Sequence, residues 1–197
     1  MARSYPYQSP LALDTGRHRD YPPATDWARQ LLSSKEFVVF DSETTGLSRP
    51  CDFVEVAAVG ASGEVLFESP VKPCVPIEIS ASRVHGHSEA SLRDAPPFAE
   101  IYPYLLELFL GKRVIVYNAA YDRRVWDEAV SRLGARASLA GRLPPWECAM
   151  QRYAAWVGER QRNHPGGYRY RKLPGGDHSA SGDCLATLKL IEKMAGN

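Results

Sequence analysis

Cysteine is scarce in this chain of 197 residues, and its four copies are scattered. Cys51, Cys74, Cys148 and Cys184 form no C-x-x-C pair, so neither a zinc knuckle nor a disulfide framework is indicated. We expect reduced, half-buried side chains that behave as small hydrophobic residues.

Long hydrophobic runs are also missing, although hydrophobic residues make up 44% of the sequence and charged residues 24%. No apolar stretch is long enough to span a bilayer. Prolines and polar residues interrupt MARSYPYQSPLALDTG at the N-terminus, where a secretory signal would need an apolar block. We therefore expect no membrane association and a cytoplasmic setting.

A large excess of either charge is lacking, since the formal net charge is +1, but the two halves of the chain differ. Residues 36–107 contain 12 acidic and 4 basic side chains, whereas residues 108–197 contain 15 basic and 8 acidic ones. This division suggests an acidic centre that faces a basic surface, or two solvated faces that differ by chance.

The hydrophobic pattern predicts an α/β domain behind a short extension. Residues 1–34 form the predicted N-terminal extension, irregular at first and then helical from Ala24, with Thr25 or Asp26 as the helix cap. Residues 35–197 form the main domain, which is long enough to bury a sizeable core.

The main domain alternates between strand and helix patterns. Strands are predicted at 36–41, 53–61, 64–71 and 112–118. Helices are predicted near Ser88, over 96–111 with a kink near Pro103, and over 118–134, 146–159 and 179–194. Three strands in a meander, followed by alternating helices and strands, favour an α/β fold with a mixed sheet.

Two acids follow the hydrophobic run of the first predicted strand, in EFVVFDSETTGL. Asp41 and Glu43 are two residues apart, so in a strand both side chains point to the same face, with Cα atoms roughly 6.5–7 Å apart. Carboxylates this close raise each other's pKa unless a cation lies between them. Hard ions such as Mg²⁺ take such oxygen ligands. The stretch indicates a metal site or, taken alone, a polar turn after a strand.

Two later segments place acids near predicted helix starts. Asp122 follows Asn118 by four residues, where an acid suits the helix dipole and by itself indicates little. His178 precedes Asp183 by five residues in HSASGD, where the last helix begins. A histidine and an acid at this spacing, in a chain that also carries the Asp41 pair, favour a composite site.

FDSETTG, YNAAYD and HSASGD, in this order, resemble the three motifs of the DnaQ-like, DEDDh-type 3′–5′ exonucleases. That family includes the proofreading epsilon subunit of the bacterial replicative DNA polymerase and ribonuclease T. The resemblance covers about residues 36–195, and VHGHS followed by APPF fits the family's intermediate segment. It implies a ribonuclease H-like fold with a mixed five-stranded sheet flanked by helices, and an enzyme that releases nucleoside 5′-monophosphates from a 3′ end.

The resemblance also implies roles for five side chains. Asp41, Glu43, Asp122 and Asp183 would surround two divalent ions, Mg²⁺ or Mn²⁺, and His178 stands where the family has its general base. Two metals about 3.5–4 Å apart can stabilise the attacking and leaving oxygens of phosphodiester cleavage. A histidine can accept the proton of the attacking water near neutral pH.

Five further positions match those that approach the terminal nucleotide in the family: Thr44, Leu47, His85, Asn118 and Tyr121. Tyr121 stands where phenylalanine is common, and a tyrosine ring can also stack on a base. Each of the five could instead be a packing or capping residue. For Asn118, helix capping is an equal alternative.

Residues 152–172 combine six Arg or Lys and one Glu with four aromatic side chains. Cations bind phosphates and aromatic rings stack on unpaired bases, so this tract before His178 is a candidate wall that guides a single-stranded 3′ end. A solvated loop whose aromatic rings are buried in the core is the alternative.

The expected partner is the 3′ end of single-stranded nucleic acid, DNA rather than RNA, with an exoribonuclease of the same fold as the alternative. The chain ends 14 residues after Asp183 and no polymerase-binding tail is evident, so a free-standing enzyme of repair or turnover is expected. VVFDSETT also approaches the D-x-D-x-T motif of haloacid-dehalogenase-like phosphatases, with Asp41 as nucleophile, but that hypothesis leaves Asp122 and His178 unexplained. A non-catalytic nucleic-acid-binding module is a third hypothesis.

Overall fold

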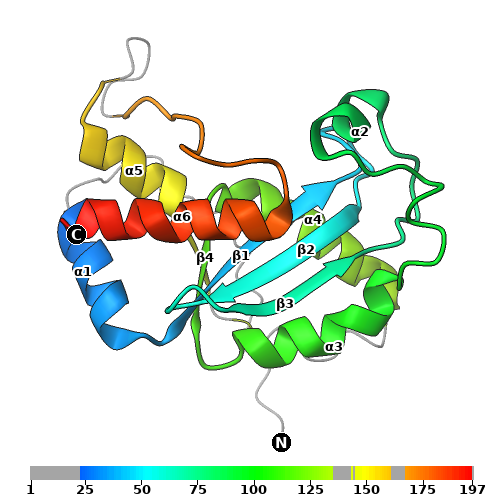
Figure 1. Ribbon diagram of the computed structural model, residues 1–197, viewed down its shortest axis with the longest axis horizontal. Helices are drawn as coiled ribbons and strands as arrows, with labels where there is room; N and C mark the ends of the chain where they lie inside the picture. The colour runs from blue at the N-terminus through cyan, green and yellow to red at the C-terminus, as the bar shows by residue number, and fades with distance from the viewer. Residues whose placement is uncertain (1–22, 135–142, 144, 161–166, 197) are drawn as a thin grey trace, which may run out of the picture.

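The protein is built on a mixed five-stranded sheet with helices on both faces, as a computed structural model shows for residues 23–134, 143, 145–160 and 167–196 (Figure 1). The strands are β1 (Phe37–Thr44), β2 (Phe53–Gly60), β3 (Val65–Pro70), β4 (Arg113–Val116) and β5 (Trp146–Cys148). They lie in the order β3-β2-β1-β4-β5. The first three form an antiparallel meander, and β4 runs parallel to both β1 and β5. The predicted mixed sheet is confirmed.

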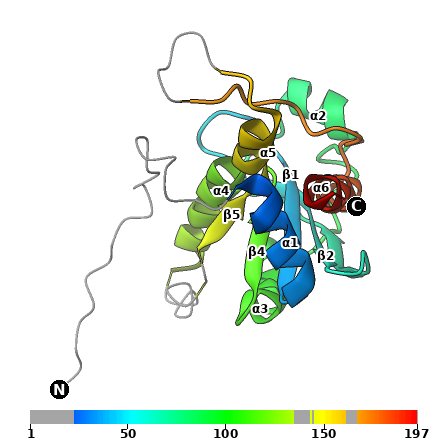
Figure 2. The same ribbon diagram turned by 90° about the vertical axis from the view of Figure 1, so that its left-hand side faces the viewer.

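Six helices lie within the described part of the chain: α1 (Ala24–Ser34), α2 (Ile79–His85), α3 (Phe98–Phe109), α4 (Ala119–Leu133), α5 (Ala149–Val157) and α6 (Ala180–Ala195). Helices α1 and α6 cover one face of the sheet, and α3 and α4 cover the other (Figure 2). Helix α5 packs against α1 and α6. None of the helices in the described ranges is long and apolar enough to cross a membrane.

Strand β1 lies at the centre of the sheet and is buried on both faces. Val38 and Phe40 join the hydrophobic cluster under α3 and α4, whereas Phe37 and Val39 join the cluster under α1 and α6. Successive side chains of a strand point to opposite faces. The side chains of Asp41 and Glu43 therefore point to the face that α6 covers, and the side chain of Ser42 points to the face that α4 covers.

The acid pair lies inside β1, which corrects the predicted end of this strand at residue 41. Pairing with β2 continues through Glu43, which lies opposite Glu55, and the register shifts only between Glu43 and Thr44. Because the strand continues, the same-face geometry predicted for Asp41 and Glu43 holds.

Three details of the predicted helices are wrong: one start, one helix that is a turn, and one cap. The helix predicted from Trp146 begins at Ala149, because Trp146–Cys148 pairs with β4 as the fifth strand. The segment at Ser88 is a hydrogen-bonded turn, in which Ser88 Oγ accepts from the Ser91 N–H at 3.2 Å, and the short helix α2 precedes it. Helix α1 begins at Ala24 directly after Pro23, so neither Thr25 nor Asp26 is its cap.

Helix α1 contributes to the hydrophobic core. Trp27 and Leu31 are buried in the cluster that α6 and the sheet share. Trp27 Nε1 also donates a hydrogen bond of 2.7 Å to Oε2 of Glu147 in β5. The predicted extension 1–34 thus supplies a core helix from its final part, whereas residues 1–22 lie outside the described residues.

Candidate active site

Side chains from three separate sequence motifs converge beside β1. Asp41 and Glu43 project from β1, Asp122 from the first turn of α4, and Asp183 from the first turn of α6. The ligand atoms of Glu43, His178 and Asp183 lie within 4.8 Å of one another. Asp41 interacts electrostatically with all three other acids. The structure therefore brings together the four acids and the histidine that the sequence singled out.

Three acids of this cluster, Asp41, Glu43 and Asp122, resist ionisation. Burial, followed by the nearby charges of Asp122, Asp183 and Glu43, raises the pKa of Asp41 well above its usual value. Burial, followed by Asp183, raises the pKa of Glu43 to about 8, and burial raises the pKa of Asp122 to about 7. A bound cation would favour the ionised forms of these groups. This donor set of carboxylates and one imidazole fits hard divalent ions.

Asp122 is held in place by Ser42, which points from β1 toward α4. Asp122 is only 4% exposed, and its Oδ1 accepts a hydrogen bond of 2.7 Å from Ser42 Oγ. Ser42 is not among the site residues predicted from sequence. The alternation of side chains along a strand could have identified it, because this alternation directs Ser42 toward α4 while Asp41 and Glu43 point toward α6.

The loop that carries His178 packs tightly onto the start of α6. Oδ1 of Asp183 accepts from the backbone N–H groups of Asp177 at 2.9 Å and His178 at 3.3 Å. Ser179 caps the helix by accepting from the Gly182 N–H at 3.1 Å, and Asp177 in turn accepts from Ser179 Oγ at 2.8 Å. A Cβ atom on Gly182 would collide with the Asp177 and Ser179 side chains. This packing, which the sequence did not reveal, sets the position of His178.

The predicted substrate contacts Leu47, Thr44 and Tyr121 differ in exposure. Leu47 is 80% exposed, whereas Thr44 is buried. Tyr121 donates to the Gly46 carbonyl at 2.7 Å and lies 2.5 Å from Thr44 Oγ1. The Arg124 guanidinium covers its ring at 5.0 Å from the centroid. Tyr121 thus supports the loop that presents Leu47, and its role as a base platform stays a prediction.

Asn118 and His85 retain polar groups that the described part of the protein does not use. Asn118 is the N-cap residue of α4, as predicted, but its side chain makes no capping hydrogen bond. His85 Nδ1 accepts from the His87 N–H at 3.1 Å, while its buried Nε2 has no partner among the described residues. Burial, followed by the neighbouring His87, lowers the pKa of His85. Both side chains can therefore bond to a ligand.

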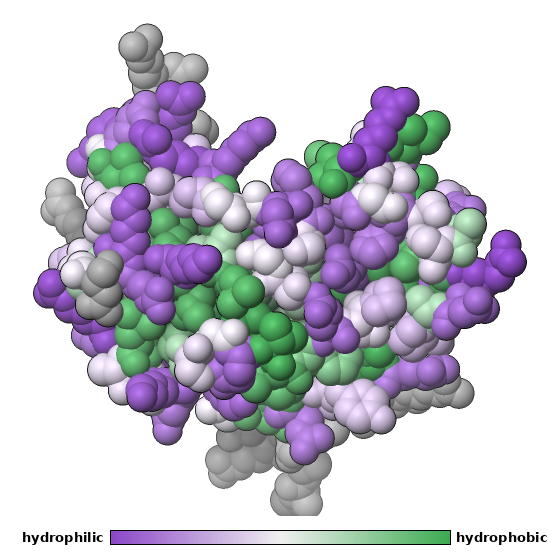
Figure 3. All heavy atoms as spheres, in the orientation of Figure 1, coloured by the Kyte–Doolittle hydropathy of each residue, from purple (hydrophilic) through white to green (hydrophobic). Residues whose placement is uncertain are grey.

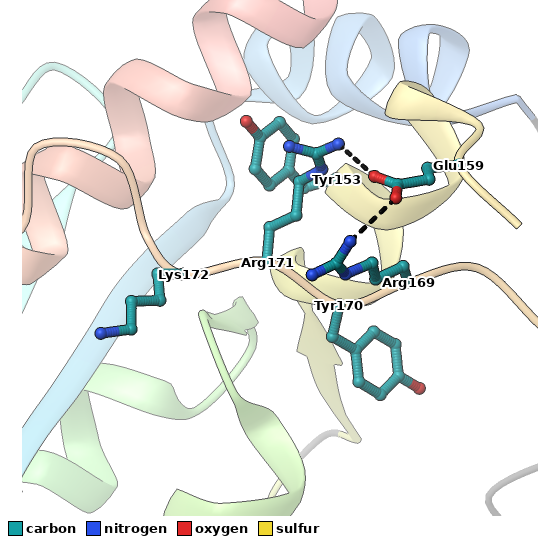
Figure 4. A pocket seen from close by; sticks show the side chains of 6 residues that line it. All are labelled: Tyr153, Glu159, Arg169, Tyr170, Arg171 and Lys172. Atoms are coloured by element: carbon teal, nitrogen blue, oxygen red, sulfur yellow. Dashed lines mark hydrogen bonds and ion pairs between the residues drawn. The ribbon is translucent and has the colours of Figure 1, made fainter. Parts of the chain in front are cut away.

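In the described parts of the basic tract, 152–160 and 167–172, every residue except Ala154 is exposed or half-buried. The molecule is hollowed between the part of the surface around α5 and the part around α2 (Figure 3). Six residues of the tract line an open pocket of about 530 Å³ (Figure 4): Tyr153, Glu159, Arg169, Tyr170, Arg171 and Lys172. Residues 161–166 of the tract lie outside the described residues.

Comparison with known proteins agrees with this geometry. The family model described as exonuclease (RNase_T) matches residues 38–191. The uncharacterised exonuclease CP81 of Escherichia phage 186 is 30% identical over 174 residues, which cover 80% of this chain and 87% of that protein. The PolC-type DNA polymerase III of Caldanaerobacter subterraneus is 36% identical over 103 residues, 50% of this chain but only 7% of that protein.

The fold is also shared with solved nucleases. Exonuclease X in complex with 5′-overhanging duplex DNA has a TM-score of 0.54 and 24% identity to this chain, covering 81% of this chain and 91% of its own. At this identity the likeness concerns the fold, which is the predicted ribonuclease H-like one.

This chain belongs to the DnaQ-like exonuclease family. It is accordingly a nuclease, an enzyme that hydrolyses phosphodiester bonds, and its family is metal-dependent. The family match rules out the haloacid-dehalogenase-like phosphatase, in which Asp41 would be the nucleophile.

Proposed function

We propose that this chain removes nucleoside 5′-monophosphates from the 3′ end of single-stranded DNA, and that it acts without a polymerase partner. The observation that carries the proposal is the convergence of Asp41, Glu43, Asp122 and Asp183 with His178 at one end of β1. A cluster of carboxylates next to a histidine, with raised pKa values at Asp41, Glu43 and Asp122, suits metal-dependent hydrolysis of a phosphodiester.

In this proposal the four acids hold two divalent ions, Mg²⁺ or Mn²⁺. The ions would supply stabilisation of the charge that develops on the attacking and leaving oxygens. His178 is exposed, so water can reach its imidazole, which accepts the proton of the attacking water. The hydrogen bonds from the Asp177 and His178 backbone to Asp183 keep this base beside the acids.

We assign binding of the terminal nucleotide to Thr44, Leu47, His85, Asn118 and Tyr121. The exposed Leu47 side chain and the His85 Nε2, which lacks a partner among the described residues, support this assignment. The CP81 protein, 87% of which is covered by the matched segment, supports a free-standing enzyme of similar length. We further propose a role in DNA repair or turnover in the cytoplasm.

The test is digestion of DNA and RNA oligonucleotides labelled at either end, with Mg²⁺, Mn²⁺ or EDTA. Single strands are compared with 5′-overhanging duplexes, the kind of DNA that exonuclease X holds in its complex. We expect 5′-labelled single-stranded DNA to give a ladder of shortened products, 3′-labelled DNA to release a labelled mononucleotide, and EDTA to stop both. Asp41→Asn is the inactive control. Internal cuts, or unchanged activity in EDTA, would contradict the proposal, and faster loss of RNA would favour the exoribonuclease.

A further inference from the structure

Glu159, two residues after the end of α5, forms ion pairs with two arginines of the segment that leads to His178. Its Oε1 accepts from Arg169 Nη1 at 3.0 Å and its Oε2 from Arg171 Nη2 at 2.5 Å. In Figure 4 the two guanidinium groups converge on this carboxylate, while Tyr170 and Lys172 point away from it. One acid therefore occupies two cations that would otherwise face solvent.

This pair of arginines is anchored close to the acidic cluster. The Tyr117 hydroxyl donates to the Arg171 carbonyl at 2.8 Å. Tyr117 directly follows β4 and precedes Asn118, which leads into the helix of Asp122. His178 lies seven positions after Arg171, so the two lie at most about 25 Å apart. The arginines are thus within reach of the last several nucleotides of a strand whose 3′ end lies at the acids.

The chemistry of the pocket suits a nucleic-acid backbone. Guanidinium groups that bind the two oxygens of a carboxylate can bind the oxygens of a phosphate in the same way. Lys172 adds a third cation, and Tyr170, which is 58% exposed, offers a ring on which an unpaired base can stack. The side chains of Arg169 and Glu159 are 68% and 41% exposed, and an exposed ion pair is held weakly enough for an incoming phosphate to replace it.

We propose that Arg169, Arg171 and Lys172 form a phosphate-binding site for the single strand that enters the active site. Glu159 is a built-in competitor that occupies the two arginines until a backbone phosphate displaces it. The inference rests on the proposed function, for which it defines the path of the strand. Glu159 thereby lowers the affinity for nucleic acid and favours release of the strand after cleavage.

Binding of a 5′-fluorescein-labelled oligodeoxynucleotide, measured by anisotropy in EDTA at several KCl concentrations, tests this role without cleavage. We expect Glu159→Gln to bind a strand of about 12 nucleotides roughly three- to tenfold more tightly than the wild type at low salt. For Glu159→Gln, the slope of the logarithm of the association constant against the logarithm of the KCl concentration should steepen by about 0.7, because one more phosphate charge is neutralised. Arg169→Gln and Arg171→Gln should weaken binding.

Glu107→Gln is the matched control, because it changes the net charge equally on α3, away from the tract. We expect its affinity to stay within about twofold of the wild type, since distant exposed charges are screened by salt.

A triple variant separates competition from a structural role of Glu159. If the acid masks the arginines, adding Arg169→Gln and Arg171→Gln to Glu159→Gln should abolish the gain in affinity. If Glu159 only fastens the segment that ends at Arg171, Glu159→Gln will bind DNA equally or more weakly, and the inference is wrong. These results do not depend on hydrolysis, so the strand site could fail while the exonuclease assay succeeds, or the reverse.

Discussion

Ser42 Oγ donates a hydrogen bond of 2.7 Å to Oδ1 of Asp122, although the two residues lie 80 positions apart in the sequence. The bond joins the central strand β1 to the first turn of α4. Burial raises the pKa of Asp122 to about 7, and the hydrogen bond from Ser42 opposes that rise. Ser42 is therefore a positioning residue for one of the four acids.

Replacing Ser42 with alanine should weaken both metal binding and activity. The buried Asp122 carboxylate would lose its donor, and loss of such supporting contacts typically costs about 10–100-fold in metal affinity or rate. Mn²⁺ titration of thermal stability and single-turnover cleavage measure the two effects. Ser69→Ala, on the exposed edge strand β3, is the control. A rate within about twofold of the wild type would show that Asp122 does not need Ser42.

The metal-free protein should become less stable as the pH rises from about 4 to about 8. The folded-state pKa values of Glu43 and Asp122, about 8 and about 7, lie above the usual 4.5 and 3.8. The folded protein therefore binds these protons more tightly than the unfolded chain does. Their stabilising effect is complete at acidic pH and is lost as the pH passes through the folded-state values.

Asp122→Asn should remove part of this pH dependence in EDTA. At about pH 8 the variant should be more stable than the wild type by about 1–3 kcal/mol, because no buried charge has to form. Thermal unfolding would show this as a gain of about 2–4 °C per kcal/mol. Glu89→Gln, at an exposed position, serves as the control. If the stability of Asp122→Asn falls with pH as steeply as that of the wild type, the prediction is contradicted.

His178→Ala distinguishes a proton acceptor from a metal ligand. If His178 accepts the proton of the attacking water, its loss should lower the cleavage rate by about 10²–10⁴-fold. Thermal stabilisation by Mn²⁺ should then stay close to that of the wild type, and added imidazole should restore part of the rate. A large loss of Mn²⁺ affinity would instead assign His178 to the metal, as its proximity to Glu43 and Asp183 also allows.

Leu31→Ala tests whether α1 stabilises the catalytic domain. Leu31 is fully buried in the cluster that contains α6, so its truncation should cost about 2–5 kcal/mol of unfolding free energy. Denaturant or thermal unfolding measures the loss. Leu66→Ala, at a 37% exposed position on β3, should cost less. Equal effects of the two substitutions would place α1 outside the cooperative unit.

Some features of the fold were predictable because their signals are local. The run of Phe37 to Phe40 predicted a buried strand, and Asn118 and Gly134 correctly bracketed helix α4. The segment Trp146–Cys148 was misassigned to a helix, because three residues are too few for a periodic pattern. It is a strand only because β4 offers an edge to pair with. The cap of α1 was misplaced because Thr25 and Asp26 suit a cap chemically, whereas the helix already begins at Ala24.

The sequence by itself determined which acids are available, their order along the chain and the shared face of Asp41 and Glu43, since these depend on residue identity and on the two-residue period of a strand. Only the tertiary structure decided that Ser42 supports Asp122 and that Glu159 occupies Arg169 and Arg171. It also decided that burial hinders ionisation of Asp41, Glu43 and Asp122. These features depend on distances and solvent exclusion between segments far apart in the sequence, and no local pattern specifies them.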